Sequence, residues 1–358
     1  MNITFLLGNG FDIGLGMPTK FEHFYNEYCK DIDSSNDNIR SFKDTLKQWL
    51  QSTDEMRKVV DWADFEKAFG EHSLDFEVSE KRKYLERFED FVNSFNLYLE
   101  NVEKCTNLED TNAITKVMNE ALKNYKTIRK ADADEIEAFY HRFGGNRLYS
   151  FVSFNYTKTV DCFYNALKVH LERDNSRNVG DLVHIHGYIE DSMIVGVNDA
   201  SQITKKEFSE DPEVVDMLVK PRQNTSSRTG HEKELRKVID NSHVICVYGM
   251  SIGDTDKKWW DYISNWLAGH ELRILVILQY ESKYNPRLPH VQSQFTKPVL
   301  TKFLSFSTLP DDKKQKITEK IYIGFNNNVF AMNLFDSEKF EKECRLAEGK
   351  SNKSPEAI

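Results

Sequence analysis

Residues 3–19 of the chain read ITFLLGNGFDIGLGMPT, and this stretch decides the predicted fold. Its first half is an apolar run that stops at Gly8-Asn9-Gly10, and further turn formers follow at Gly14, Gly16 and Pro18. An apolar run that ends in glycines is typical of a buried parallel strand leading into a tight turn. If a helix starts beyond that turn, its unpaired N–H groups and its dipole favour an anion such as phosphate. The stretch therefore predicts either a nucleotide-binding turn or a glycine-lined strand–helix turn without a ligand.

The dinucleotide fingerprint G-x-G-x-x-G is not completed here, because Ile13 occupies the third glycine position and Gly14 comes one residue late. Beyond the turn, Thr19-x-x-Glu22 has the form of a capping box. Aromatic residues at helical spacing follow it, and we predict a helix over about residues 20–30.

The region from about residue 34 to residue 145 has a different character. It contains no proline, and apolar stripes with a 3.6-residue period occur in it three times, the longest from Tyr84 to Leu99. Such stripes are typical packing faces. We therefore predict an all-helical subdomain that is inserted after the first strand–helix unit.

Strand patterns return after Gly144-Gly145. The apolar runs with strand composition are Leu148–Phe154, Leu182–Ile185, Met193–Val197, His243–Tyr248 and Leu272–Leu278. Helices are predicted over Val160–Leu171 and after Asp254, whereas the polar segment Lys220–Gly230 has the composition of a mobile loop.

This alternation predicts an α/β fold with a doubly wound, mostly parallel sheet. We assign residues 1–33 and 146–335 to this α/β domain and residues 34–145 to the helical insertion. Residues 336–358 form a C-terminal tail, and we expect its end, from Gly349 onward, to be disordered.

Polar or glycine-bearing turns follow four of the predicted strands. They are Gly8-Asn9-Gly10, Asn155-Tyr156-Thr157, His186-Gly187 and Gly249-Met250-Ser251. In an open α/β sheet, ligands bind outside the carboxyl ends of the strands, so the four turns define one site. His184 and His186 alternate along a strand and point to opposite faces, and we expect His186 to be functional and His184 to pack.

Composition excludes several other classes. The chain has 358 residues, of which 39% are hydrophobic, and its net charge is −9. A globular protein is expected, and a general nucleic-acid-coating role is disfavoured. The five cysteines are scattered without a C-x-x-C pair, and no apolar stretch approaches the ~20 residues of a membrane span. We expect a soluble cytoplasmic protein that does not enter the membrane.

Four motifs in this order resemble the AbiH family of bacterial abortive-infection proteins. They are GNGFDIGLGMPT at 8–19, SFNYTKT at 153–159, HIHG at 184–187 and YGMSIGDTD at 248–256. The resemblance covers about residues 1–25 and 146–270. That family is in turn similar to the sirtuin-like NAD-binding fold, a Rossmann-type fold that several anti-phage NAD-hydrolysing proteins use.

The resemblance implies a role for each matching position. Asn155 would hold the nicotinamide ribose and an attacking water, and His186 would act on a ribose hydroxyl as the second catalytic residue. Gly8 and Gly10 would carry the adenosine-side phosphates, and Gly249 and Ser251 would support pyrophosphate and ribose. From their places at the strand ends we also predict as cofactor-binding residues Asn9, Phe11, Asp12, Thr157, Gly187 and Asp254. These roles agree with the polar turns, because cleavage of a nicotinamide–ribose bond passes through an oxocarbenium-like state that needs a placed water and an imidazole.

Two positions depart from the sirtuin-like pattern. Asp12 stands where serine is usual, and Thr157 stands where aspartate is usual. A carboxylate facing a pyrophosphate repels it, so Asp12 would cap the turn, accept a ribose hydroxyl or ligate Mg²⁺. Asp254 and Asp256 likewise fit either a helix cap or a Mg²⁺ site, although no set of metal ligands is assigned. Lys220, Arg222 and Arg228 are interpreted as solvated loop charges, or as phosphate ligands if the loop closes as a lid over the site.

Three hypotheses follow for the function. The first is an anti-phage effector that binds NAD or a related nucleotide and hydrolyses its N-glycosidic bond. The second is a nucleotide-binding sensor without catalysis, and the third is a metal-dependent nuclease built on Asp12, Asp254 and Asp256. As partners we expect a small-molecule nucleotide, a phage-derived trigger or partner protein and a second copy of the chain, whereas nucleic acid is disfavoured.

Overall fold

The computed structural model describes residues 1–30, 36–51, 59, 61–172, 174, 176–226, 230–285, 289–326 and 329–351. Within these ranges the chain forms one six-stranded sheet in which every neighbouring pair is parallel. The strands are β1 (Asn2–Leu7), β2 (Arg147–Ser153), β3 (Arg177–His184), β4 (Val244–Tyr248), β5 (Ile274–Gln279) and β6 (Ile321–Phe325). The predicted α/β class is confirmed.

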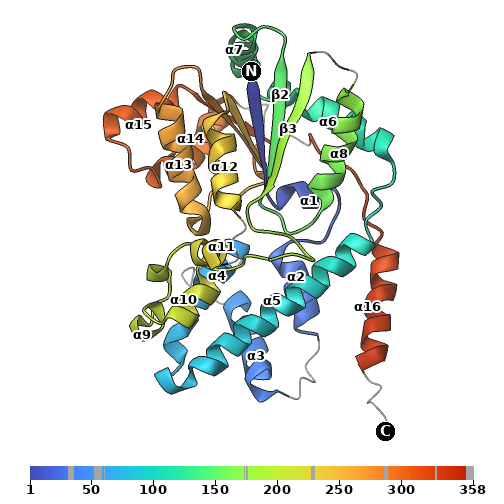
Figure 1. Cartoon of the computed structure of the whole chain (residues 1–358), viewed down its shortest axis with the longest axis vertical. Coiled ribbons are helices and arrows are strands. Elements are labelled where there is room, and N and C mark those ends of the chain that lie inside the picture. Colours follow the sequence, from blue (N-terminus) through green and yellow to red (C-terminus); the bar gives the residue numbers. More distant parts are fainter. Residues whose placement is uncertain are drawn as a thin grey trace.

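The strand order is β3-β2-β1-β4-β5-β6, so the chain builds one half of the sheet from β1 outward and then returns to build the other half. Leu7 at the end of β1 is level with Ser153 on one side and with Tyr248 on the other. The turns after β1, β2 and β4 therefore lie next to one another where the strand order reverses. Figure 1 shows the strands running from the N-terminus at the top toward a group of helices below their carboxyl ends.

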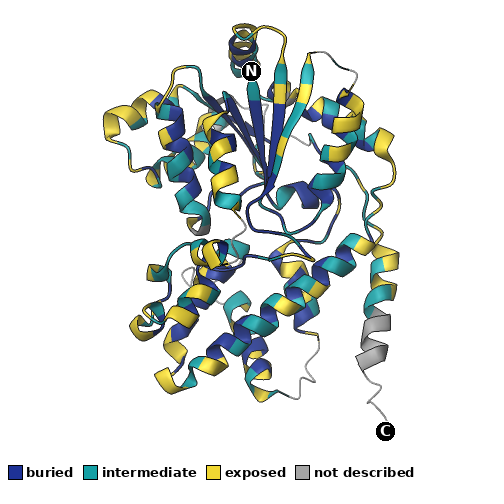
Figure 2. Cartoon of the chain, in the orientation of Figure 1, coloured by how far each residue is buried: buried dark blue, intermediate teal, exposed yellow. Residues whose placement is uncertain are grey.

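Side chains alternate between two apolar cores, one on each face of the sheet. Phe5 packs on Phe151 and Phe330 in one core, whereas Leu6 belongs to the other core together with Val152 and Val247. A strand that is buried on both faces has no polar side, which is why these strands read as continuous apolar runs. Strands β1, β4 and β5 are buried along most of their length, whereas the edge strand β3 is buried only near its carboxyl end (Figure 2).

Helices cover both faces of the sheet. These are α1 (Gly10–Gly14), α6 (Thr111–Ala121), α7 (Lys130–His141), α8 (Thr159–Leu171), α12 (His231–Asp240), α13 (Lys257–Ala268), α14 (Pro289–Ser305) and α15 (Asp311–Thr318). A short 3₁₀ turn, η5 (Asp254–Asp256), leads into α13. The C-terminal α16 (Ser337–Ser351) runs beside α5.

The helices below the carboxyl ends of the strands are here called the helical layer. They are α2 (Phe21–Tyr28), α3 (Asp37–Gln51), α4 (Trp62–His72), α5 (Lys81–Lys104), α9 (Lys206–Ser209), α10 (Pro212–Leu218) and α11 (Lys220–Ser226). Aromatic rings fill its centre, where Phe65 stacks on Phe91 with ring centroids 4.0 Å apart and Phe24 packs edge-on against Phe91.

The helical layer coincides only in part with the predicted insertion. Of the predicted residues 34–145, α6 packs on α8 beside the sheet, and α7 reaches β6, where Tyr322 donates to Glu135 over 3.2 Å. In exchange, α9, α10 and α11 come from the second half of the chain.

Three local predictions are wrong. Residues 193–197 form no strand, since Val197 makes only an isolated bridge to Val219. Lys220–Ser226 is helix α11 rather than a loop, and Arg228 lies outside the described residues. The Thr19 capping box is absent, because Lys20 occupies the N-cap position of α2. The predicted disorder from Gly349 falls partly on α16, which continues to Ser351, and residues 352–358 lie outside the described ranges.

Candidate functional site

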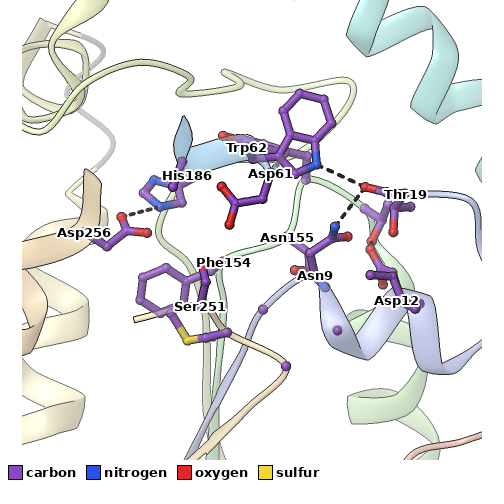
Figure 3. A pocket seen from close by; sticks show the side chains of 18 of the residues that line it. Asn9, Asp12, Thr19, Asp61, Trp62, Phe154, Asn155, His186, Ser251 and Asp256 are labelled. Atoms are coloured by element: carbon purple, nitrogen blue, oxygen red, sulfur yellow. Dashed lines mark hydrogen bonds and ion pairs between the residues drawn. The ribbon is translucent and has the colours of Figure 1, made fainter. Parts of the chain in front are cut away.

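A cavity of about 460 Å³ lies between the carboxyl ends of the strands and the helical layer. The turns after β1, β2, β3 and β4 form its floor, and α4, α5 and α11 form its roof (Figure 3). The polar and charged side chains that line it are Asn9, Asp12, Thr19, Asp61, Glu66, Asn155, Thr157, His186, Lys220, Ser251, Asp256 and Gln279. Its volume is within the range of small-molecule sites.

The glycines of the floor are explained by contact between two turns. A Cβ on Gly10 would lie 2.4 Å from Gly249 Cα, and a Cβ on Gly8 would lie 2.8 Å from the Gly249 carbonyl oxygen. Gly249 itself has φ +66°, a conformation that glycine adopts without strain.

The backbone N–H groups of these turns are already hydrogen-bonded. Gly8 N–H donates to Tyr248 O, Gly10 N–H to Gly249 O and Phe11 N–H to Gly8 O, over 2.7–3.0 Å. The expectation of free N–H groups for phosphate at the start of α1 is therefore wrong for these three amides. For Gly8 and Gly10 the acceptors lie at the end of β4 and in the turn after it, and for Phe11 the acceptor is the Gly8 carbonyl of the same turn.

Asp12 ties the turn after β1 to the turn after β2. Thr157 Oγ1 donates to its Oδ2 over 2.7 Å, and Thr159 Oγ1 donates to its Oδ1 over 2.6 Å. Burial raises the pKa of Asp12 to about 6, and the bonds from Thr159 and Thr157 together with the nearby Asn155 amide only partly oppose that rise. Asp12 and Thr157 are thus engaged mainly with each other.

Asn155 and Thr19 present buried polar atoms that the protein leaves unpaired. Asn155 is 4% exposed and Thr19 is 3% exposed. Neither amide atom of Asn155, nor Thr19 Oγ1, forms a hydrogen bond to any residue that the structure describes. Buried polar groups are almost always satisfied, so unpaired atoms around a cavity indicate a place for polar ligand atoms or water.

His186 contacts Asp256 on the side of the cavity away from Asp12 and Thr19 (Figure 3). Its Nε2 lies 3.3 Å from Asp256 Oδ1, and its ring packs against Phe154 and Tyr156. Burial, reinforced by the charge of Lys220, lowers the pKa of His186, while Asp256 acts in the opposite direction. The imidazole is therefore neutral at pH 7 and able to accept a proton.

Lys220 and Glu66 complete a buried charge cluster beside His186. Lys220 Nζ lies 2.9 Å from Glu66 Oε2 and 3.7 Å from Asp256 Oδ1. Burial by itself raises the pKa of Asp256, but Lys220 and His186 outweigh it and hold that pKa below its usual range. Burial also raises the pKa of Glu66, and Lys220 only partly opposes this.

Comparison with known families bears on the identity of the chain. The family described as bacteriophage abortive infection AbiH matches residues 4–278. The chain belongs to the AbiH family. Among curated proteins, the comparison found no match. The AbiH match runs from β1 into β5 and includes α4, α5 and α11, so it covers both the floor and the roof of the cavity.

The structure brings together nine of the twelve site residues predicted from the sequence and the AbiH resemblance. Those that line the cavity are Gly8, Asn9, Gly10, Asp12, Asn155, Thr157, His186, Gly249 and Ser251. Phe11 instead packs in the core against Phe163 and Phe330. Gly187 forms a tight turn against the Ser192 carbonyl, and Asp254 is exposed outside the lining.

Sequence reasoning missed most of the roof of this AbiH site, namely Asp61, Trp62, Glu66 and the true position of Lys220. Glu66 carried a signal, since it falls four residues after Trp62 on the apolar face of α4, where a charge is out of place. Lys220 carried none. Asp256, proposed as a cap, stands at the N-cap of α13 but makes no capping bond, because its carboxylate faces His186 and Lys220.

The geometry offers little support for metal chemistry in this AbiH protein. Among the described residues no group of three or more His, Cys, Asp or Glu side chains could hold a metal ion. Asp12 and Asp256 line the cavity and Asp254 does not, so the proposed nuclease triad is not assembled. The described residues also contain no helix long and apolar enough to cross a membrane.

Proposed function

We propose that this AbiH protein acts in abortive infection by binding NAD, or a related N-ribosyl nucleotide, in the cavity and hydrolysing its N-glycosidic bond. One observation carries the proposal. Around a single cavity, Thr19, Asn155 and His186 hold buried polar atoms without a hydrogen-bond partner among the described residues. This is the pattern of a site whose partners arrive with a ligand.

The position of the cavity supports a nucleotide ligand. The order β3-β2-β1-β4-β5-β6 is the strand order of dinucleotide-binding Rossmann sheets. In those sheets the ligand lies at the carboxyl ends of the strands where the order reverses, between β1 and β4 in this chain.

The charge of the cavity supports glycosidic cleavage. Asp12, Asp61, Glu66 and Asp256 line it, and Lys220 is the only lysine or arginine among the described lining residues. Cleavage of an N-ribosyl bond develops positive charge on the ribose ring. Fixed carboxylates around the cavity stabilise that charge.

The reaction then assigns a role to each candidate catalytic residue. The bond between ribose C1′ and the nicotinamide nitrogen breaks, and its electron pair leaves with the nicotinamide, which becomes neutral. A water held by the Asn155 amide adds to C1′, and neutral His186 accepts the proton that the water loses. Asp256 stabilises the imidazolium that results, and the product is free ribose hydroxyl at C1′.

The test is the NAD content of cells that express the protein, before and after phage challenge. Wild type should deplete NAD, whereas His186→Gln should slow depletion about 10²- to 10⁴-fold and Asn155→Ala should also impair it. His184→Gln is the matched control, because His184 pairs with Asp161 outside the cavity lining. If NAD is unchanged in a culture that expresses the wild-type protein and is still protected from the phage, this reaction is excluded.

A nucleotide sensor without catalysis is the second candidate. One observation favours it: Asp12 and Thr157, the two departures from the sirtuin-like pattern, hydrogen-bond each other over 2.7 Å, so this part of the cavity differs from the expected NAD site. Calorimetry that finds one nucleotide bound per chain, with no nicotinamide released over hours in phage-infected extract, would select this candidate.

A further inference from the structure

A chain of four charged or titratable side chains joins the helical layer to the candidate catalytic histidine. Glu66 on α4 contacts Lys220 on α11 over 2.9 Å, Lys220 approaches Asp256 of η5 over 3.7 Å, and Asp256 contacts His186 over 3.3 Å. The far oxygen of Glu66 accepts from Gly196 N–H over 3.2 Å. Every member lines the cavity.

The free energy needed to bury these charged side chains indicates that they have a role beyond stabilising the fold. Glu66, Lys220 and His186 are each at least nine-tenths buried. Removing charges from water is expensive, and a buried ion pair often stabilises a fold no more than apolar residues of the same size. The four residues also come from four separate elements, so no single turn or helix requires them.

We infer that Lys220 is a positioning residue that acts on His186 through charge: from the roof of the cavity it lies beside Asp256, sets the balance of charge around the imidazole and so makes the helical layer part of the catalytic machinery. The catalytic role of His186 rests on the proposed function. The contacts that join Glu66, Lys220, Asp256 and His186 are independent of it. Lys220 lies between two carboxylates, and without it Glu66 and Asp256 would face the same buried space with no cation between them.

The surroundings of His186 make Lys220 the decisive charge. Asp256 is the carboxylate in contact with the ring, and Lys220 is the cation beside it. The Tyr156 ring packs on the imidazole, but burial holds the pKa of this phenol well above its usual value, so it stays neutral. His231 also lowers the pKa of His186, but less than Lys220 does.

The experiment is an NMR titration of the His186 ring in protein labelled at histidine, with the signal assigned by its loss in His186→Gln. In Lys220→Met the pKa of His186 should rise, because the cation is gone and Asp256 remains. In Asp256→Asn it should fall, because the anion is gone and Lys220 remains. Lys220→Arg keeps the charge and should keep the wild-type value.

Two further variants cover misfolding and non-specific effects. Glu66→Gln/Lys220→Met removes the pair together, leaves no second carboxylate unpaired, and should again raise the pKa of His186. Lys81→Met removes a lysine that bridges Asp211 and Glu213 inside the helical layer, and it should leave the His186 titration unchanged.

The outcomes separate the inference from the proposed function. If the pKa of His186 stays at the wild-type value in both Lys220→Met and the double variant, Lys220 is only a structural clamp and the inference is wrong. The titration needs no substrate, so a protein that leaves NAD intact still tests it. If NAD is hydrolysed, the acidic limb of the kcat/KM profile should move in the same direction as the His186 titration.

Discussion

The floor and the roof of the cavity are built in different ways. The floor consists of strand-end turns that touch through backbone, as in the Gly10 N–H to Gly249 O bond of 2.7 Å. The roof consists of helices that reach the floor through side chains, above all the Lys220 bridge to Glu66 and Asp256. The sheet register therefore fixes the floor, whereas a few buried charges hold the roof. The two halves should respond differently to substitution.

The largest expected effect is on the floor. Gly249→Ala puts a Cβ 2.6 Å from Gly10 Cα at φ +66°, so left-handed strain and a backbone overlap act together. We expect a loss of about 5 kcal/mol in the free energy of unfolding, or failure to fold. Gly144→Ala is the matched control, with φ +69° and no described atom within 4 Å, and it should cost only about 1 kcal/mol. Equal losses in urea denaturation would show that the turns do not need this contact.

Lys220→Met is the corresponding change in the roof. Loss of the cation leaves Glu66 and Asp256 unpaired, and we expect a loss of about 3–4 kcal/mol at pH 7. Because the pKa of Glu66 is already raised, its protonation relieves the repulsion as pH falls, so the loss should be smaller at pH 5. Lys81→Met, which removes a more exposed ion pair, should cost about 0.5 kcal/mol. A Lys220→Met loss that does not change between pH 5 and pH 7 would contradict this account.

Asp12 tests the floor by pH. Its folded pKa of about 6 lies above the ordinary 3.8, so its contribution to stability is fully present below about pH 4 and is lost as pH rises through 6. Asp12→Asn removes this dependence. Relative to wild type, the variant should gain about 2 kcal/mol between pH 4 and pH 8, although it loses one of the two threonine hydrogen bonds. Asp110→Asn, at the exposed N-cap of α6, is the control for loss of one negative charge. If the free energy of unfolding changes with pH in the same way in wild type and in Asp12→Asn, a group other than Asp12 is responsible for the pH dependence.

The sheet could be predicted from the sequence because its strands are buried on both faces. The prediction Leu272–Leu278 lies within two residues of β5 at each end, and His243–Tyr248 is within one residue of β4. Met193–Val197 has the same apolar composition and is no strand. It follows the turn after β3, where Ile194 N–H donates to the His186 carbonyl over 2.8 Å, and its one strand-like contact is the isolated bridge from Val197 to Val219.

Site residues could be predicted from the sequence only where they lie in the turns that follow the strands. Gly8, Asn155 and His186 follow strands directly, and the parallel sheet brings strand ends together whatever lies between them in sequence. The Lys220 contact with Glu66 joins residues 154 positions apart on two helices, and no local pattern encodes it. A lysine in a polar segment reads as solvated until the partner helix is placed against it.

The smallest expected effect is at the edge of the floor, where the predicted ligand-binding residue lies two positions from the residue that lines the cavity. Asp254 was predicted to bind the ligand, but it is exposed and does not line the cavity, whereas Asp256, two residues on, contacts His186. Asp254→Asn should therefore change the free energy of unfolding by no more than about 0.5 kcal/mol and leave NAD depletion in challenged cells at the wild-type rate. Asp256→Asn, the same chemical change at the neighbouring carboxylate, should abolish depletion because the imidazolium loses its counter-charge. If Asp254→Asn abolishes depletion as well, the ligand extends past the cavity over the start of η5, and the binding site includes Asp254.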